Sequence, residues 1–368
     1  MRSRTRSIRF KISALLGVPV VALVVLWGFV AAVTGEDALE QRDFDLLNDR
    51  LGGPAQNLVR ELGQERLRTA MFLSTGATGG AAERGDLNAQ RARTDAAAAA
   101  FRTQVLAPEA RTAYPEATRR YADEMIRRLD GLAAVRSTAD PRPADRLAAI
   151  TGYNAVLDSL FRFFGELSAR GDVSLDHGAQ AIITAHRGLD VLGRESALIA
   201  AAGTAGRLTE AEHEMFSAQV TTRRFLMEEA RTRLAEAGFR DAYEPVFVSP
   251  AYVTLTSLED RIVDNGARLP DGLSAWQPTA RTLGNSFDGA AMRARTSLAE
   301  RSDQISERSL LRLGVAGGLG LVMLVASILF SVRFGRRLTR ELVGLQEAAR
   351  DLAEVQLPEV VDKLRQRT

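Results

Sequence analysis

The sequence contains no cysteine, which excludes disulfides, thiolate metal sites and cysteine nucleophiles. Aromatic residues make up only 6% of the chain, whereas alanine, leucine and arginine are abundant, and this balance favours helices over sheets. Neither sign of charge is in large excess, because the formal net charge is +2, and we therefore expect no nucleic-acid partner. The sequence predicts an all-α protein.

Motifs of catalysis are also missing from the sequence. It has no nucleotide-binding motif of the G-x-x-x-x-G-K-[ST] type and no evident Ser/His/Asp arrangement. His177, His186 and His213 lack a metal-binding spacing, and we expect them to be exposed structural residues. We predict no catalytic residue, no cofactor and no metal site, so the chain as given is not a kinase by itself.

Two long apolar stretches stand out among the features that are present. Residues 313–332 contain no charge and are long enough for a helix to cross the roughly 30 Å hydrocarbon core of a bilayer. Residues 12–33 are also apolar, and their length favours an uncleaved membrane anchor over a cleaved signal peptide. Basic residues before the first stretch and after the second place both termini in the cytoplasm. We therefore predict a two-pass protein of the plasma membrane.

These spans divide the chain into predicted segments. The segments are a cytoplasmic N-terminus (1–11), a first transmembrane helix (12–33), an extracytoplasmic helical domain (34–312), a second transmembrane helix (313–332) and a cytoplasmic tail (333–368). Within the domain, periodicity predicts helices near 36–50, 54–76, 85–107, 109–135, 143–170, 176–203, 209–237, 250–265 and 273–311. The stiff Asp140-Pro141-Arg142-Pro143 segment predicts a boundary between halves at about 34–140 and 143–312.

Local signals support several of these helix ends. Gly52-Gly53-Pro54 predicts the end of one helix and the start of the next. Thr209 followed by Glu212 predicts a capping box, in which each side chain binds the other residue's backbone N–H. An L-G-x-E motif at 62–65 recurs at 192–195, which makes a duplicated helical bundle a hypothesis.

A polar pair interrupts the apolar stripe of the helix predicted at 54–76. Glu65 and Arg66 fall where the stripe should continue, and an arginine on a buried face must find an anion. One interpretation is a structural ion pair, with Glu65 or with Glu195 of the sister segment. The other is that Arg66 binds a small anion, because a planar guanidinium offers paired donors to a planar oxyanion.

The sister segment shows a similar interruption. Glu195 breaks its apolar stripe and Arg194 lies at the margin, so the two segments are candidates to face a common polar site. In the next predicted helix, we expect the adjacent Arg223 and Arg224 to form a solvated face.

The segments at 58–76 and 189–230 resemble the two signatures of the nitrate- and nitrite-sensing (NIT) domain of bacterial sensor histidine kinases. The resemblance implies two helical bundles, with nitrate or nitrite held between arginines. Arg66 matches the arginine of the first signature. In the second signature the family's arginine follows the glutamate, whereas here Ser196 follows Glu195 and Arg194 precedes it. The candidate anion-binding residues are therefore Arg66, Arg194, Glu65 and Glu195.

The cytoplasmic tail carries a heptad seam formed by Leu338, Leu342, Leu345, Ala349 and Leu352. Directly after a membrane span, this seam resembles the first helix of a HAMP signal relay, which implies a homodimer. A basic amphipathic helix on the inner leaflet is the alternative.

We expect the chain to be the sensor portion of a two-component sensor histidine kinase, with phosphorelay to a response regulator only if a kinase domain follows. A chemoreceptor-like or adaptor protein without kinase output and a ligand-free membrane anchor remain as alternatives.

Overall fold

The structure is a computed structural model, and it describes residues 50–75, 80–140, 145–167 and 173–294. It also describes the isolated positions 25, 28, 296, 318, 322–323, 325–330 and 333. The chain divides into two compact units, of which one comprises Met1–Ala38 and Asp303–Thr368 and the other Leu39–Ser302. The helical domain described below belongs to the second unit.

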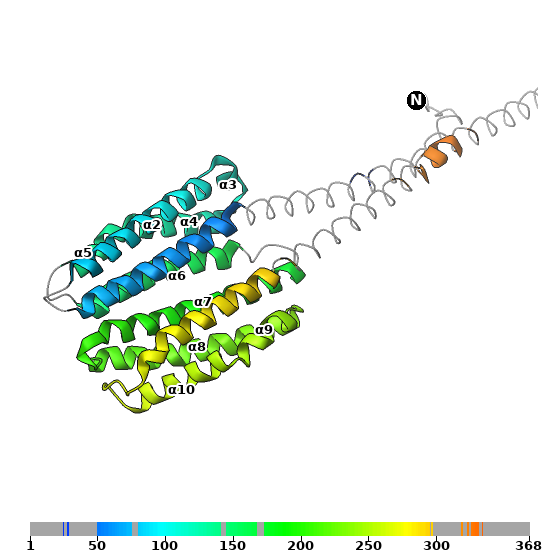
Figure 1. Cartoon of the computed structure of the whole chain (residues 1–368). Coiled ribbons are helices and arrows are strands. Elements are labelled where there is room, and N and C mark those ends of the chain that lie inside the picture. The colour runs from blue at the N-terminus through cyan, green and yellow to red at the C-terminus, as the bar shows by residue number, and fades with distance from the viewer. Residues whose placement is uncertain are drawn as a thin grey trace, which may run out of the picture. The chain divides into compact units, whose positions relative to one another are not determined.

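Figure 1 shows a first group of helices packed side by side, and these helices share one apolar core. Its members are a helix over residues 50–74, α2 (Ala81–Val105), α3 (Pro108–Ala113), α4 (Glu116–Asp130), α5 (Leu132–Ala139) and α6 (Arg146–Leu167). Leu58, Leu62, Phe101 and Tyr153 are fully buried in this core. Tyr153 lies on α6, so a helix that follows the predicted linker contributes to the core of the helices that precede it. The boundary between halves stays a prediction.

Two expectations about helix ends in this group are wrong. The predicted break at Gly52-Gly53-Pro54 is absent, because the helix is continuous over residues 50–74 and both Leu51 and Ala55 are buried in the core. This packing offsets the low helix propensity of glycine and proline. The single helix predicted at 109–135 is divided at Pro115, which holds the preceding Tyr114 in an extended conformation, and again at Gly131.

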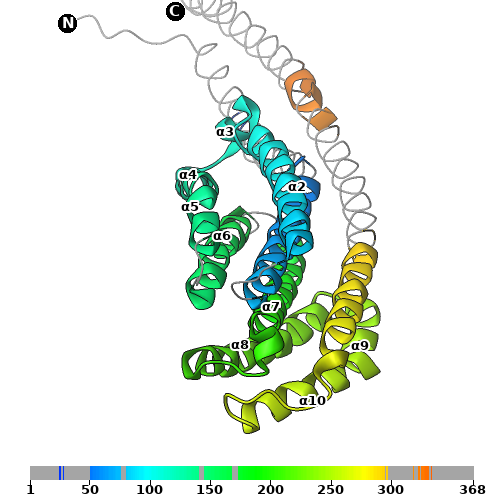
Figure 2. The same cartoon turned by 60° about the vertical axis from the view of Figure 1, so that its left-hand side comes forward.

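A second group of helices forms most of another apolar core, to which Ala70 of the helix 50–74 and Ile150 of α6 also contribute. It comprises α7 (Val173–Ala202), η3 (Gly203–Ala205), α8 (Glu210–Glu236), α9 (Arg240–Phe247), α10 (Pro250–Asp264), η4 (Leu273–Ala275) and a helix over residues 276–294. Figure 2 shows α9 beside the yellow helix 276–294, where the rings of Tyr243 and Phe287 lie 6.1 Å apart. The capping box at the start of α8 is confirmed, with reciprocal bonds between Thr209 and Glu212.

The described residues are helical apart from turns, loops and one isolated bridge between Arg207 and Arg268, which confirms the predicted all-α class for this part of the chain. No helix within the described ranges is long and apolar enough to cross a membrane. The predicted span 12–33 and the tail 333–368 lie almost wholly outside these residues. Of the span 313–332, positions 318, 322–323 and 325–330 are described, all helical, and large apolar side chains such as Met323 and Phe330 are exposed.

Candidate functional site

Arg66 enters the contact between the two helix groups from the helix 50–74. Its side chain is 1% exposed, and Nη1 donates to Oδ1 of Asn154 on α6 at 2.8 Å. Nη2 lies 2.9 Å from Oδ1 of Asp190 on α7 and donates to the Asp190 backbone carbonyl at 3.2 Å. A single guanidinium thus ties its own helix to α6 and to α7.

Asp190 joins Arg66 to a second arginine. Its other oxygen, Oδ2, accepts from Nε of Arg194 at 2.9 Å and lies 2.8 Å from Nη2 of the same side chain. Arg194 Nη2 also pairs with Asp158 on α6. Both helices present their polar residues at the same spacing. Asn154 and Asp158 lie four residues apart on one face of α6, and Asp190 and Arg194 do so on α7. The two predicted arginines therefore meet at one carboxylate.

Burial and charge set the protonation of this cluster. Burial lowers the pKa of Arg66, although Asp190 opposes that effect. Burial also acts to raise the pKa of Asp190, but the guanidiniums of Arg66 and Arg194 outweigh it and lower that pKa. Burial acts to lower the pKa of Arg194, and the carboxylates of Asp190 and Asp158 outweigh it, so this pKa is raised. The shifts of Asp190 and Arg194 therefore both favour the charged form, so the contacts between these two side chains are an ion pair.

Glycine on α7 makes room for the Arg66 side chain. A Cβ atom at Gly193 would lie 2.4 Å from Nη2 of Arg66, which is closer than real contacts allow. Directly after α7, at the start of η3, a Cβ atom at Gly203 would lie 2.4 Å from the Cβ atom of Ser74. Because residues 66 and 74 face residues 193 and 203 in that order, the helix 50–74 and α7 run side by side in the same direction. The sister segments that share the L-G-x-E motif thus pack against each other.

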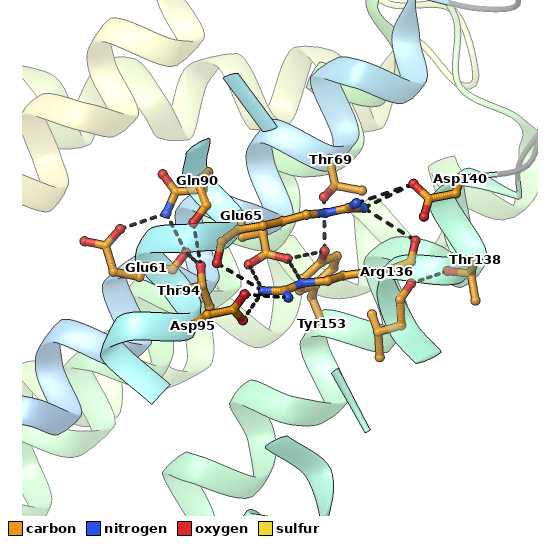
Figure 3. A network of polar contacts seen from close by, with 12 residues as sticks. Glu61, Glu65, Thr69, Gln90, Thr94, Asp95, Arg136, Thr138, Asp140 and Tyr153 are labelled. Atoms are coloured by element: carbon orange, nitrogen blue, oxygen red, sulfur yellow. Dashed lines mark hydrogen bonds and ion pairs between the residues drawn. The ribbon is translucent and has the colours of Figure 1, made fainter. Parts of the chain in front are cut away.

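Glu65 belongs to a second polar network, which lies within the first helix group (Figure 3). The buried carboxylate accepts from Nε and Nη2 of Arg136 on α5 at 2.7 and 3.0 Å, and from the Tyr153 hydroxyl at 2.7 Å. Thr69 donates to the same hydroxyl, and Asp95 on α2 lies 2.8 Å from Arg136. Burial, and then Glu65, raise the pKa of Tyr153. Arg66 does form the predicted structural ion pair, but its partner is Asp190, and the expectation that Glu65 or Glu195 would be that partner is wrong.

Glu195 belongs to a third cluster, inside the second helix group. Arg223 Nη2 lies 2.5 Å from Glu259 on α10, whereas Arg223 Nε is 3.6 Å from Glu195 Oε1. The expectation that Arg223 and Arg224 form a solvated face is wrong for Arg223. Its side chain is 0% exposed and lies between the buried side chains of Glu259 and Glu195. Arg224, at 38%, spans Glu259 and Asp260. Burial, and then Glu259, raise the pKa of Glu195 well above its ordinary value.

Of the four predicted residues, the structure brings Arg66 and Arg194 together and places Glu65 and Glu195 elsewhere. The residues that sequence reasoning missed are Asn154, Asp158 and Asp190. A weak signal was available for Asp190 alone, because it precedes Arg194 by one helical turn and is therefore placed to pair with it.

Comparisons with known proteins agree with this helical architecture. A family model described as "Nitrate and nitrite sensing" matches residues 57–302, which is more than half of the chain. The solved structure of the NasR transcription antiterminator is similar, with a TM-score of 0.62, 17% sequence identity and 90% of each chain covered. At this identity the likeness shows the fold alone. No curated protein matches the chain.

Proposed function

The chain belongs to the nitrate- and nitrite-sensing family, and from this membership we propose that it is the sensor portion of a signal receptor for a small planar oxyanion such as nitrate or nitrite. The observation that carries the proposal is the position of Arg66. Its guanidinium is buried where the two helix groups meet, and it shares one carboxylate with Arg194.

The chemistry of this site suits a planar oxyanion. Two guanidiniums present paired N–H donors whose geometry matches oxygen atoms held in a plane, and a charged hydrogen bond is strong where water is excluded. Gly193 lets Arg66 approach the backbone of α7, so the donors are held in place by packing as well as by charge. Among the predicted site residues, Arg66 and Arg194 are the ones that we propose contact the ligand, while Glu65 and Glu195 support the surrounding helices.

A route for the signal leads from this site toward the C-terminal end of the domain. Arg194 is two residues from Ser196 on α7, whose hydroxyl accepts a 3.0 Å hydrogen bond from Trp276. Trp276 is fully buried at the start of the helix 276–294. We propose that an anion favouring one arrangement of α7 changes the position of this helix, since a ligand shifts an equilibrium only by binding one state better.

The output beyond this helix is also part of the proposal. We propose that residues 12–33 and 313–332 cross the plasma membrane, that both termini are cytoplasmic, and that residues 333–368 begin a HAMP relay in a homodimer. The exposed apolar side chains of Met323 and Phe330 support an apolar environment around the second span. A histidine kinase with its response regulator is the proposed output. The NasR structure is that of a transcription antiterminator, so the shared fold does not decide among outputs.

Calorimetric titration of the full chain in detergent micelles tests the sensor proposal. Nitrate, nitrite and chloride are titrated into the wild type and into an Arg66→Lys variant, which keeps the charge and loses the planar pair of donors. Arg68→Lys is the matched control, because Arg68 lies two residues away on the same helix, is 37% exposed and pairs with Asp86.

We expect saturable binding of nitrate or nitrite by the wild type and by the Arg68 variant. We expect binding by the Arg66 variant to be weaker by about tenfold, the effect of one charged hydrogen bond. An Arg66 variant that folds and binds normally would place the site elsewhere. A wild type that binds neither oxyanion would contradict the sensing function.

A further inference from the structure

Asp190 occupies the space between the two site arginines as a small ligand would. Its Oδ1 lies 2.9 Å from Arg66 Nη2, and its Oδ2 lies 2.9 and 2.8 Å from Nε and Nη2 of Arg194. The side chain is 3% exposed. A planar carboxylate with one oxygen on each guanidinium has the shape and charge of a free planar oxyanion bound at the same point.

The charges of the cluster cancel while Asp190 is in place. Arg66 and Arg194 contribute two positive charges, and Asp190 and Asp158 contribute two negative charges. An incoming anion therefore meets no net attraction unless one carboxylate leaves its arginine. The two carboxylates differ in burial and in their partners. Asp158 is 46% exposed and, of the two site arginines, pairs with Arg194, whereas Asp190 is 3% exposed. Asp190 is the one that both guanidiniums share.

We infer that Asp190 is a built-in competitor of the sensed anion, whose carboxylate holds the place between Arg66 and Arg194 that a small planar oxyanion takes when the sensor is loaded. The inference rests on the proposed function and adds to it a residue that sets affinity and selectivity. Binding becomes an exchange of one anion for another. Only a ligand that offers oxygen atoms to both guanidiniums replaces the contacts that Asp190 gives up. A spherical chloride does not satisfy that condition.

The exchange also has a consequence for signalling. The Arg66–Asp190 contact is a direct tie between the helix 50–74 and α7, made of one ion pair and one bond to the backbone carbonyl. A ligand that displaces the carboxylate breaks the ion pair and frees α7 to shift against its neighbour. A two-state sensor needs a contact that is present in one state and absent in the other, and the Arg66–Asp190 ion pair is such a contact.

Removal of the competitor tests the inference. Asp190→Ala in the full chain leaves the buried guanidinium of Arg66 and the half-buried one of Arg194 facing one partly exposed carboxylate, and an added oxyanion should fill the gap. The probes are sodium nitrate, formate and acetate, each compared with sodium chloride at equal ionic strength, by thermal unfolding and calorimetry. Asp158→Ala is the matched control, because it removes one negative charge from the same cluster and leaves Asp190 in place.

We expect nitrate to bind the Asp190→Ala variant about tenfold more tightly than it binds the wild type, since it no longer competes with a tethered carboxylate. Formate and acetate should raise the unfolding temperature of this variant more than that of the wild type, in which Asp190 competes with them. Asp158→Ala should show neither effect to a comparable degree. If Asp190→Ala does not fold, Asp190→Asn, which removes the charge and keeps the shape, is measured in the same way.

The outcomes separate this inference from the proposed function. A wild type that binds nitrate together with an Asp190 variant that binds it no more tightly overturns the inference and leaves the sensor proposal standing. An Asp190 variant that binds oxyanions when the wild type binds none supports the inference and contradicts nitrate sensing by the native chain. Equal gains in nitrate affinity in the Asp190 and Asp158 variants would mean that the loss of one negative charge explains the effect, and they would also overturn the inference.

Discussion

Removing either partner of the ion pair between Arg66 and Asp190 should lower stability strongly. Both side chains are at most 3% exposed, so removing either one leaves the other charge buried. Breaking a buried pair in this way costs roughly 3–5 kcal/mol. Arg66→Ala leaves Asp190 with Arg194 at 2.8 Å, and we therefore expect a loss at the lower end of that range, about 3 kcal/mol.

A double-mutant cycle measures this pair by urea unfolding followed by helical circular dichroism. Because Arg66→Ala and Asp190→Ala each remove the same contact, the double variant should lose less than the sum of the single losses, with a coupling of about 1–3 kcal/mol. Arg68→Ala, at an exposed position of the same helix, should cost much less. Additive losses, or a cost of Arg66→Ala no larger than that of the control, would refute the placement of Arg66 in a buried pair.

Three further substitutions test other parts of the structure. Glu195→Gln should flatten the pH dependence of stability. Because the pKa of Glu195 is raised in the folded chain, this chain keeps a proton that the unfolded chain loses above about pH 4.5, and wild-type stability therefore falls as the pH rises from there. The same slope of unfolding free energy against pH in the variant and the wild type would contradict this. Tyr153→Phe removes a hydrogen bond to the buried Glu65 carboxylate and should cost about 1.5–3 kcal/mol in urea unfolding. Thr209→Ala removes the cap of α8 and should cost about 1 kcal/mol, and a neutral effect would argue against the capping box.

The helices of the domain were largely predictable because their signals are local. Periodicity and caps placed the helices at 209–237 and 250–265 close to α8 and α10 as the structure has them. The continuous helix through Gly52-Gly53-Pro54 was not predictable in this way. Its formation depends on burial of Leu51 and Ala55 in a core that distant helices complete.

The candidate site was predictable only in part for a related reason. Arg66 interrupts an apolar stripe within its own helix, and that local pattern correctly indicated a buried arginine. Which carboxylate it meets depends on helix packing, so Asp190, 124 residues away, was not identified. Arg223 was misjudged because its burial depends on Glu259, which reaches it from α10. Sequence patterns identify charges that need partners, and tertiary packing selects the partners.

The most direct test of the central claim is the affinity of the full chain for nitrate and nitrite, measured side by side with Arg66→Lys and Arg68→Lys. We predict saturable oxyanion binding that chloride does not reproduce, weakened by the Arg66 substitution and unchanged by the Arg68 substitution. Equal affinities in the two variants, or no binding by the folded wild type, would contradict an anion sensor built on Arg66.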